Sequence, residues 1–246
     1  MLAGATLPEI GPLPATRPAK ENTQPDKDAL PGGVPEKDNV PDKDSVSDTD
    51  RPLQPPPLVE EDAAAFRACT QALRESGAII KEEARIDTTD GCGIARPIVV
   101  SRLASDIEIG PPAILRCETA LQLQRWTREA ILPAINAVMP AKRLAGLEQA
   151  SAYVCRKRNG SANGKISEHA FGNAIDIAAF RFSDGSRLGI AARDEDATAE
   201  GALQRAAVAS ACLYFRTVLD PGSDAAHESH LHLDVMTRSN GYRYCW

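Results

Sequence analysis

Hydrophobic side chains recur at helical spacing where the aromatic-containing part of the chain begins. Across residues 60–76, Phe66, Cys69 and Leu73 repeat at intervals of three and four residues, which places them on one face of a helix. Gly77 follows directly, and glycine most readily adopts the left-handed conformation that ends many helices. The pattern therefore predicts a first helix over residues 60–76.

Two further helices are expected downstream. Residues 115–138 carry apolar side chains at every fourth position from Trp126 to Val138, which predicts the second helix. Pro133 lies inside this segment, and because proline has no N–H donor it must kink or divide the helix. A third helix is expected over residues 199–218, after a charged loop.

Shorter segments are typical of strands. Residues 97–100 follow turn glycines and predict one strand, and residues 149–155 predict another, with a turn-rich loop over residues 159–164 after it. Two more strands are expected over residues 174–180 and 230–235. Together the elements predict an α+β domain, with an antiparallel sheet and flanking helices.

The last two strands each have one apolar and one polar side, because successive side chains alternate between faces. Ile175 and Ile177 point one way, and Asp176 points the other way. In the final strand, Leu231, Leu233 and Val235 share one face, and His230, His232 and Asp234 share the opposite face. If the two strands are neighbours, an aspartate and two histidines converge.

All four histidines of the chain lie in two short motifs. One motif runs from His169 to Asp176, and the other contains His227, His230 and His232. A turn hydrogen bond is the alternative for His169 alone, and a solvated strand face is the alternative for the second motif; the clustering favours metal binding over both. Two histidines and one aspartate suit zinc, and three protein ligands leave a fourth position for water, as in hydrolytic sites.

Composition separates an N-terminal segment from the rest of the chain. Twelve of the eighteen prolines lie between Pro8 and Pro57, whereas the first aromatic residue is Phe66. A segment without aromatic residues buries too little apolar surface to offset the entropy of ordering its backbone. We therefore expect residues 1–58 to form a disordered Pro/Asp/Lys-rich linker and residues 59–246 to form one domain.

The cysteines are even in number, widely spaced and confined to the second segment: Cys69, Cys92, Cys117, Cys155, Cys212 and Cys245. None forms a Cys-x-x-Cys pair. This usage favours disulfides and a periplasmic or secreted location, with six buried thiols as the alternative. The sequence leaves the pairing open.

Charge and hydropathy exclude two classes of partner. The net charge of -6 and the pI near 5.3 are unlike the basic surfaces that bind nucleic acid. No run of eighteen apolar residues is present, so no membrane span is expected. Residues 1–4 also lack the basic and apolar regions with which a signal peptide begins. The sequence gives no indication of oligomeric state.

The two histidine motifs resemble a known zinc peptidase superfamily. The pattern Ser167-x-His169-x-x-Gly172-x-Ala174-x-Asp176, followed by His227-x-x-His230-x-His232, is similar to that of D-alanyl-D-alanine carboxypeptidases, murein endopeptidases and the Hedgehog signalling domain. More narrowly, Tyr153-x-Cys155-Arg156 with residues 167–177 and 222–227 resembles the bacterial extensin-like C-terminal domain, over nearly all of residues 62–246. The resemblance implies a Hedgehog/D-Ala-D-Ala peptidase-like fold and a zinc ion held by His169, Asp176 and His232.

The same resemblance implies roles for further residues. His230 is expected beside the metal, which makes His230 or His227 the candidate for catalytic proton transfer. Arg156 matches an arginine that meets the substrate in relatives, with a solvated surface arginine as the alternative. Ser167 is expected to bind the substrate together with Arg156 and to form a hydrogen bond within its own loop. In the same loop, Gly172 is expected to adopt a backbone conformation that residues with a side chain avoid.

The expected function is zinc-dependent hydrolysis of amide bonds in peptidoglycan stem peptides, by a carboxypeptidase or endopeptidase reaction. Ser229 stands where some relatives have a glutamate base, so the identity of the base stays open. One alternative is a non-catalytic zinc-containing module that binds cell wall or protein, against which the retained His227 and His230 argue. The other alternative is a structural tether in which the proline-rich segment is the functional part.

Overall fold

A mixed β-sheet flanked by helices forms the framework of the protein. The computed structural model describes residue 58 and residues 60–158, 165–193 and 195–246. The expected linker, apart from residue 58, and the expected loop over residues 159–164 lie outside these ranges. The sheet consists, in spatial order, of β1 (Ile79–Glu82), β4 (Ile98–Ala104), β5 (Ile107–Leu115), β6 (Leu144–Ser151), β7 (Ala174–Phe182), β10 (Leu231–Asp234), β9 (Thr217–Leu219) and β11 (Tyr244–Cys245), with β8 (Arg187–Gly189) paired to β7. A separate hairpin joins β2 (Ile86–Asp87) to β3 (Gly93–Ile94).

The first helix, α1 (Ala63–Glu75), confirms the prediction for this segment. Its N-terminus is capped by Asp62, whose side chain accepts hydrogen bonds from the backbone N–H groups of Ala64 and Ala65. Gly77 follows the helix with φ of 84°, the left-handed conformation expected from the sequence. A local sequence signal therefore sets both ends of this helix.

The second predicted helix is divided around Pro133, as expected. It consists of α2 (Cys117–Trp126), a π-helical turn (Thr127–Ile131) and α3 (Leu132–Val138). The backbone N–H of Leu132 bonds to the carbonyl of Thr127, five residues earlier. The wider π turn thus ends two residues before Pro133, which has no N–H to donate.

The sheet is mixed, so the expectation of an antiparallel sheet is corrected. Most pairs are antiparallel, but β5 pairs with β6 in parallel, and β9 pairs with β11 in parallel. The connection between β5 and β6 runs through α2 and α3, and a helical crossover of this kind returns the chain in the same direction. The protein nevertheless keeps the predicted α+β class.

In three predicted segments a boundary differs from the structure by at least four residues. The strand expected over residues 97–100 extends to Ala104 as β4. The strand expected over residues 149–155 is β6, which begins at Leu144 and ends at Ser151, because the next residue, Ala152, leaves the sheet and its carbonyl bonds to a histidine. The last helix, α4 (Ala199–Tyr214), ends four residues before the expected Val218, because the chain turns into β9 and pairs with β10.

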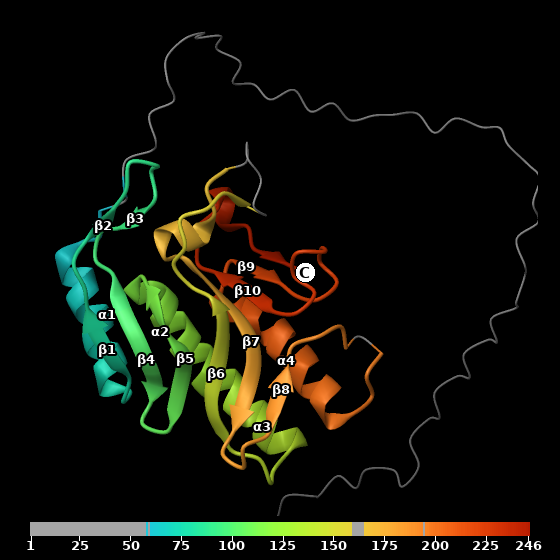
Figure 1. Cartoon of the computed structure of the whole chain (residues 1–246). Coiled ribbons are helices and arrows are strands. Elements are labelled where there is room, and N and C mark those ends of the chain that lie inside the picture. Colours follow the sequence, from blue (N-terminus) through green and yellow to red (C-terminus); the bar gives the residue numbers. More distant parts are fainter. Residues whose placement is uncertain (1–57, 59, 159–164, 194) are drawn as a thin grey trace, which may run out of the picture. The chain divides into compact units, whose positions relative to one another are not determined.

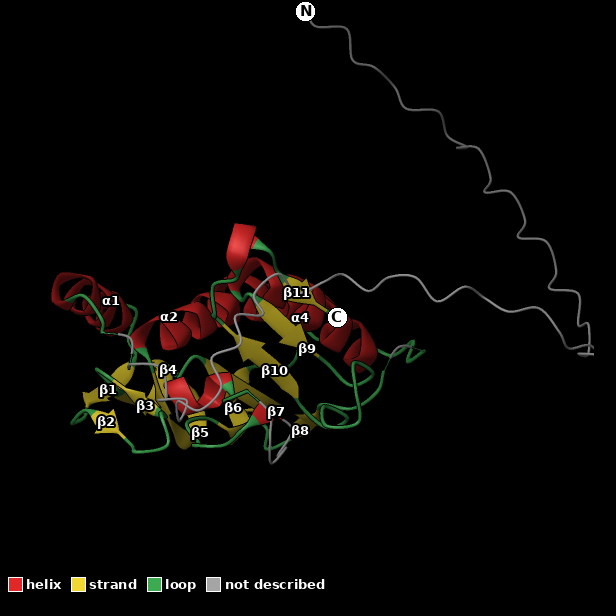
Figure 2. Ribbon diagram, turned by 90° about the horizontal axis from the view of Figure 1, so that it is seen from above, coloured by secondary structure: helices red, strands yellow, loops and turns green. Residues whose placement is uncertain are grey.

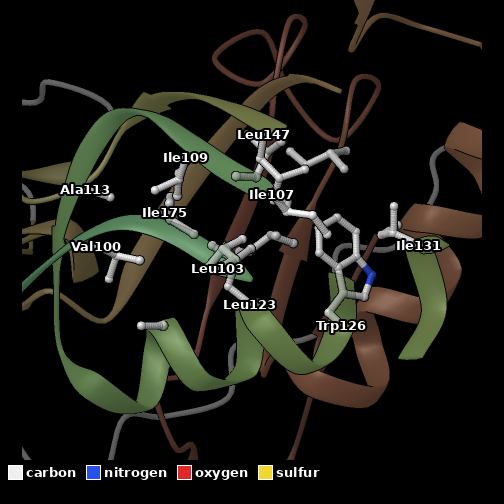
Figure 3. Close-up of a cluster of buried hydrophobic side chains, with 14 of the residues drawn as sticks. Val100, Leu103, Ile107, Ile109, Ala113, Leu123, Trp126, Ile131, Leu147 and Ile175 are labelled. Carbon is white, nitrogen blue, oxygen red and sulfur yellow. The ribbon is translucent and has the colours of Figure 1, made fainter. Parts of the chain in front are cut away.

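The helices cover one side of the sheet and form the core with it. Figure 2 shows α1, α2 and α4 along the same side of the strands. Apolar side chains from the sheet, including Val100 and Ile175, meet Leu123 and Trp126 of α2 (Figure 3). The Trp126 indole is fully buried, and its Nε1 donates to the carbonyl of Ala207 on α4 at 3.2 Å. This contact joins two helices across the core.

Three disulfides connect distant parts of the chain. Cys69–Cys117 links α1 to α2, Cys92–Cys155 links the β2–β3 hairpin region to the chain after β6, and Cys212–Cys245 links α4 to β11. The expected use of the cysteines is therefore confirmed, and it is typical of proteins that fold outside the reducing cytoplasm. None of the described helices has the length and apolar character needed to cross a bilayer.

Candidate metal centre

Strands β7 and β10 bring the two histidine motifs together. They are neighbours in the sheet (Figure 1). Their pairing is antiparallel, and the register sets His232 directly opposite Asp176. Leu231 and Leu233 face the core from the same strand that carries His232, as the alternating pattern predicts. The expected convergence of the two motifs is thus confirmed by the pairing of their strands.

A short 3-10 helix, η3 (Glu168–Phe171), presents His169 to the two strands. It ends at Gly172, whose φ is 66°, so the expectation of a special backbone conformation here is confirmed. A Cβ at this glycine would lie 2.5 Å from Ile94 Cδ1 and 2.9 Å from the backbone nitrogen of Arg116. The Gly172 carbonyl also accepts a hydrogen bond from Thr119 Oγ1 at 2.8 Å. The turn that carries His169 is therefore held closely against the β5–α2 junction.

The ligand atoms of three buried residues form a small triangle. His169 Nε2 lies 3.1 Å from His232 Nδ1 and 3.2 Å from Asp176 Oδ1, and His232 Nδ1 lies 2.9 Å from the same carboxylate oxygen. Two nitrogens and one oxygen at these separations can hold a single metal ion. We refer to His169, Asp176 and His232 as the metal triad.

Both histidines of the triad have a second contact that orients the ring. His169 Nδ1 donates to the carbonyl of Ala152 at 2.7 Å, which leaves the lone pair on Nε2 for the triad. His232 directs Nδ1 into the triad, and its Nε2 lies 3.5 Å from Asp234 Oδ2. Metal-binding histidines commonly use their second nitrogen in this way, with a carbonyl or a carboxylate as the partner.

The electrostatics of the triad favour a bound cation. Burial opposes ionisation of Asp176, but hydrogen bonds with His169 and His232 outweigh it and hold the pKa of this carboxyl well below its usual range. Burial also acts against charging His232, yet Asp176 and Asp234 raise its pKa to about 9. Without a metal ion, a proton on His232 thus supplies the positive charge that the two carboxylates require.

The two remaining histidines lie next to the triad. His230 Nε2 is 3.7 Å from Asp176 Oδ2, and the rings of His227 and His232 have their centroids 5.6 Å apart. Burial lowers the pKa of His230, although the charge of Asp176 acts in the opposite direction. His227 Nδ1 donates to Asp224 Oδ1 at 2.7 Å, which leaves its Nε2 to accept a proton.

A cleft of about 300 Å³ opens onto the triad. Arg156 and Ser167, the predicted substrate-side residues, line this cleft together with His169, His227 and His232. The Arg156 side chain is exposed, and Ser167 is buried.

Backbone hydrogen bonds hold the Ser167 segment in place. The N–H of Ser167 donates to the Arg156 carbonyl, and its own carbonyl accepts from Ala170, so the expected hydrogen bonding within the loop is made by the backbone. Glu228 and Ser229 are exposed.

A family model for the extensin-like protein C-terminus matches residues 67–246. The chain belongs to this extensin-like family. The match includes both histidine motifs and all six cysteines. No curated protein and no solved structure matches the chain significantly.

A larger hollow in this extensin-like domain lies away from the triad. It measures about 510 Å³ and is lined by residues of α2, of the end of α4 and of the C-terminal segment, among them Arg125, Tyr214 and Arg243. It contains none of the four histidines. The smaller cleft is therefore the one in which ionisable groups and metal ligands meet.

Several contributors to the centre were not assigned from the sequence of this extensin-like domain. Alternation places Asp234 on the polar face of its strand but gives it no role, and the motifs give none to Asp224. The Ala152 carbonyl left no signal, because any residue type provides one. A carboxylate two or three residues from a clustered histidine is the signal that could have identified both aspartates.

Proposed function

We propose that this domain is a zinc-dependent hydrolase that cleaves amide bonds in peptidoglycan stem peptides outside the cytoplasm. The observation that carries the proposal is the metal triad, whose two histidines line a cleft, with two further histidines beside it. The resemblance of both motifs to the zinc peptidase superfamily supports the substrate class. The three disulfides are in keeping with a periplasmic or secreted location.

The triad suits zinc better than a hard cation. Its ligand atoms are separated by 2.9 to 3.2 Å, close to the roughly 3.3 Å expected between two ligands of tetrahedral zinc. Calcium and magnesium prefer sites made of oxygen atoms, and here two of the three ligand atoms are nitrogens. His169, Asp176 and His232 would hold the ion, and a bound zinc ion supplies Lewis-acid activation of water and of the scissile carbonyl.

Residues of the chain provide the proton transfer that amide hydrolysis requires. His227, oriented by Asp224, can accept a proton at Nε2 and return it to the leaving amine. His230 lies beside the Asp176 carboxylate, where a neutral imidazole can donate or accept a hydrogen bond. Arg156 at the cleft can bind a peptide carbonyl or carboxylate.

Digestion of purified muropeptides, with and without chelator, tests this function. We expect products that mass spectrometry assigns to one cleaved amide bond, and we expect chelation to stop their formation. His169→Ala should lose both stoichiometric zinc and activity, whereas His227→Gln should keep zinc and lose most of the activity. Unchanged turnover in His169→Ala would refute the assignment.

The same measurements separate the two other functions considered. A non-catalytic wall-binding or protein-binding module would retain stoichiometric zinc and form no product. A structural tether would show neither zinc nor product. Metal content by mass spectrometry, measured on the protein used for digestion, therefore distinguishes all three.

A further inference from the structure

Arg238 is a cationic residue of the cleft that the proposed mechanism does not use. It follows β10 and lines the same cleft as His232. Its Nη2 donates to Thr217 Oγ1 of β9 at 2.8 Å, which fixes the guanidinium on the β9 side of the metal triad. The side chain is half-buried.

The hydrogen bonding of Arg238 is incomplete within the described residues. Three arginines have a buried Nε without a partner there: Arg181, Arg193 and Arg238. Arg181 contacts Glu108 at 3.4 Å, and Arg193 contacts Asp196 at 2.6 Å, so each has a carboxylate elsewhere on its guanidinium. No carboxylate pairs with Arg238 in the part of the chain that the structure describes. A half-buried guanidinium of this kind lacks the partner that buried charges ordinarily have.

The acidic residues of the cleft are engaged with other groups. Glu168 accepts a hydrogen bond from Arg158 at 3.1 Å, and Asp224 bonds to His227. Asp234 Oδ2 lies 3.5 Å from His232 Nε2. Since these carboxylates already have partners, the positive charge of Arg238 stays available to a ligand that enters the cleft.

We propose that Arg238 binds a carboxylate of the substrate, on the β9 side of the metal triad. A guanidinium presents five N–H donors in a planar fork, and two of them match the two oxygens of a carboxylate. Arg156 and Arg158 are instead held near the 3-10 helix η3, because the Arg156 carbonyl accepts from the N–H of Ser167 and Arg158 donates to Glu168. The inference rests on the proposed function and refines it: the substrate is an acidic peptide whose carboxylate lies on the β9 side of the cleaved bond.

Such a carboxylate has two sources, the C-terminus of the peptide or an acidic side chain within it. Four N-acetylated tetrapeptides of alternating L- and D-residues distinguish them. One has a free C-terminus and an internal glutamate, the second is its C-terminal amide, the third has glutamine in place of glutamate, and the fourth carries both changes. Binding to the full-length zinc-loaded protein is measured by calorimetry, and the same samples go to mass spectrometry for cleavage.

Arg238→Ala, Arg238→Lys and a control variant, Arg125→Ala, test the subsite. Arg125 is exposed and lies outside the cleft, in the larger hollow. We expect Arg238→Ala to weaken binding of the doubly acidic peptide by about 10- to 100-fold, the usual effect of losing a charged hydrogen bond. The lysine variant should recover part of the affinity, and the control should bind as the wild type does.

Comparison of the peptides identifies the carboxylate. One of the two modifications, the C-terminal amide or the glutamine, should abolish the difference in peptide affinity between the wild type and Arg238→Ala. That modification identifies the carboxylate that Arg238 binds. Equal weakening of all four peptides by Arg238→Ala would show a structural role and overturn the subsite, as would no weakening at all. Peptide binding that depends on Arg238, without any cleavage, would support the subsite and refute the hydrolase function. Peptide cleavage with binding that does not depend on Arg238 would support the hydrolase function and refute the subsite.

Discussion

The two sides of the β7–β10 strand pair differ in what stabilises them. On the helix side, Ile175, Ile177 and Leu233 are fully buried among apolar neighbours, and burial of apolar surface contributes stability without a particular partner. On the other side, Asp176 is also buried, but its carboxylate contacts the imidazole rings of three histidines. Along β7, Ile175 and Ile177 therefore belong to the hydrophobic core, and Asp176 between them belongs to the metal triad.

This difference predicts separable effects of substitution. Burying a carboxylate costs solvation free energy, and its charged partners do little more than offset this cost. The metal triad is therefore expected to add little to the free energy of unfolding. The apolar side is the opposite case, because each buried side chain there contributes about 1.5 to 3 kcal/mol. Variants on the helix side should lower the free energy of unfolding, and variants on the triad side should change metal binding.

Replacement of Trp126 by alanine should have the largest effect. Trp126 is fully buried between the sheet and α4, and its removal leaves a large cavity. We expect a loss of about 3 to 5 kcal/mol in the free energy of unfolding, measured by urea denaturation. Trp246→Ala is the matched control, because Trp246 is 59% exposed, and it should change stability little. Equal losses in the two variants would contradict the assignment of the core.

Leu233→Ala tests the helix side of the strand that carries His232. Leu233 is fully buried, and its loss should cost about 2 to 5 kcal/mol. Its side chain points away from the triad, so below the unfolding transition the variant should still bind one metal ion per chain. Calorimetric titration with zinc measures this, and a large loss of affinity in the folded variant would show that the two faces are not independent.

Sequence patterns predicted the elements whose signals are local. Alternation placed Asp176 and His232 on the polar faces of their strands, and Pro133 marked the division of the second helix. They failed for β5, where Gly110, Pro111 and Pro112 are typical of a loop. The structure accommodates these residues because β5 pairs with β6 only over Glu108–Gly110, before the prolines.

Other features of the site depend on contacts between distant segments. The parallel pairing of β5 with β6, the Ala152 carbonyl on His169 and the position of Arg238 beside Thr217 all follow from tertiary packing. No residue type or spacing specifies a contact of this kind. For the same reason, the sequence indicated three disulfides but left their pairing open.

The Cys92–Cys155 disulfide links the stability of the fold to the edge of the cleft. Arg156 follows Cys155 directly and lines the cleft. Cys92→Ser with Cys155→Ser should lower the free energy of unfolding by about 2 to 4 kcal/mol, because the open chain gains entropy when unfolded. It should also weaken binding of the acidic peptide while metal content stays at one ion.

The matched control for this variant is Cys69→Ser with Cys117→Ser, which opens the disulfide between α1 and α2 on the helix side. The sequence separations of the two disulfides, 63 and 48 residues, are close enough for similar losses of stability. Peptide binding should be affected only by the first pair of substitutions. Equal weakening by both would show that the disulfide acts through stability alone.

Asp234→Asn gives the smallest change in the fold and the sharpest test of the triad side. Asp234 Oδ2 lies 3.5 Å from His232 Nε2, and the amide keeps the size of the side chain but removes its charge. Metal affinity should fall by about 10- to 100-fold, the usual effect of losing the carboxylate that orients a histidine ligand. The backbone N–H of Met236 donates to the other carboxylate oxygen of Asp234, and the asparagine oxygen can accept this bond, so the metal-free protein should unfold almost as the wild type does. Unchanged zinc affinity in calorimetric titration would mean that the strand alone orients His232. The Asp234 carboxylate would then have no part in metal binding.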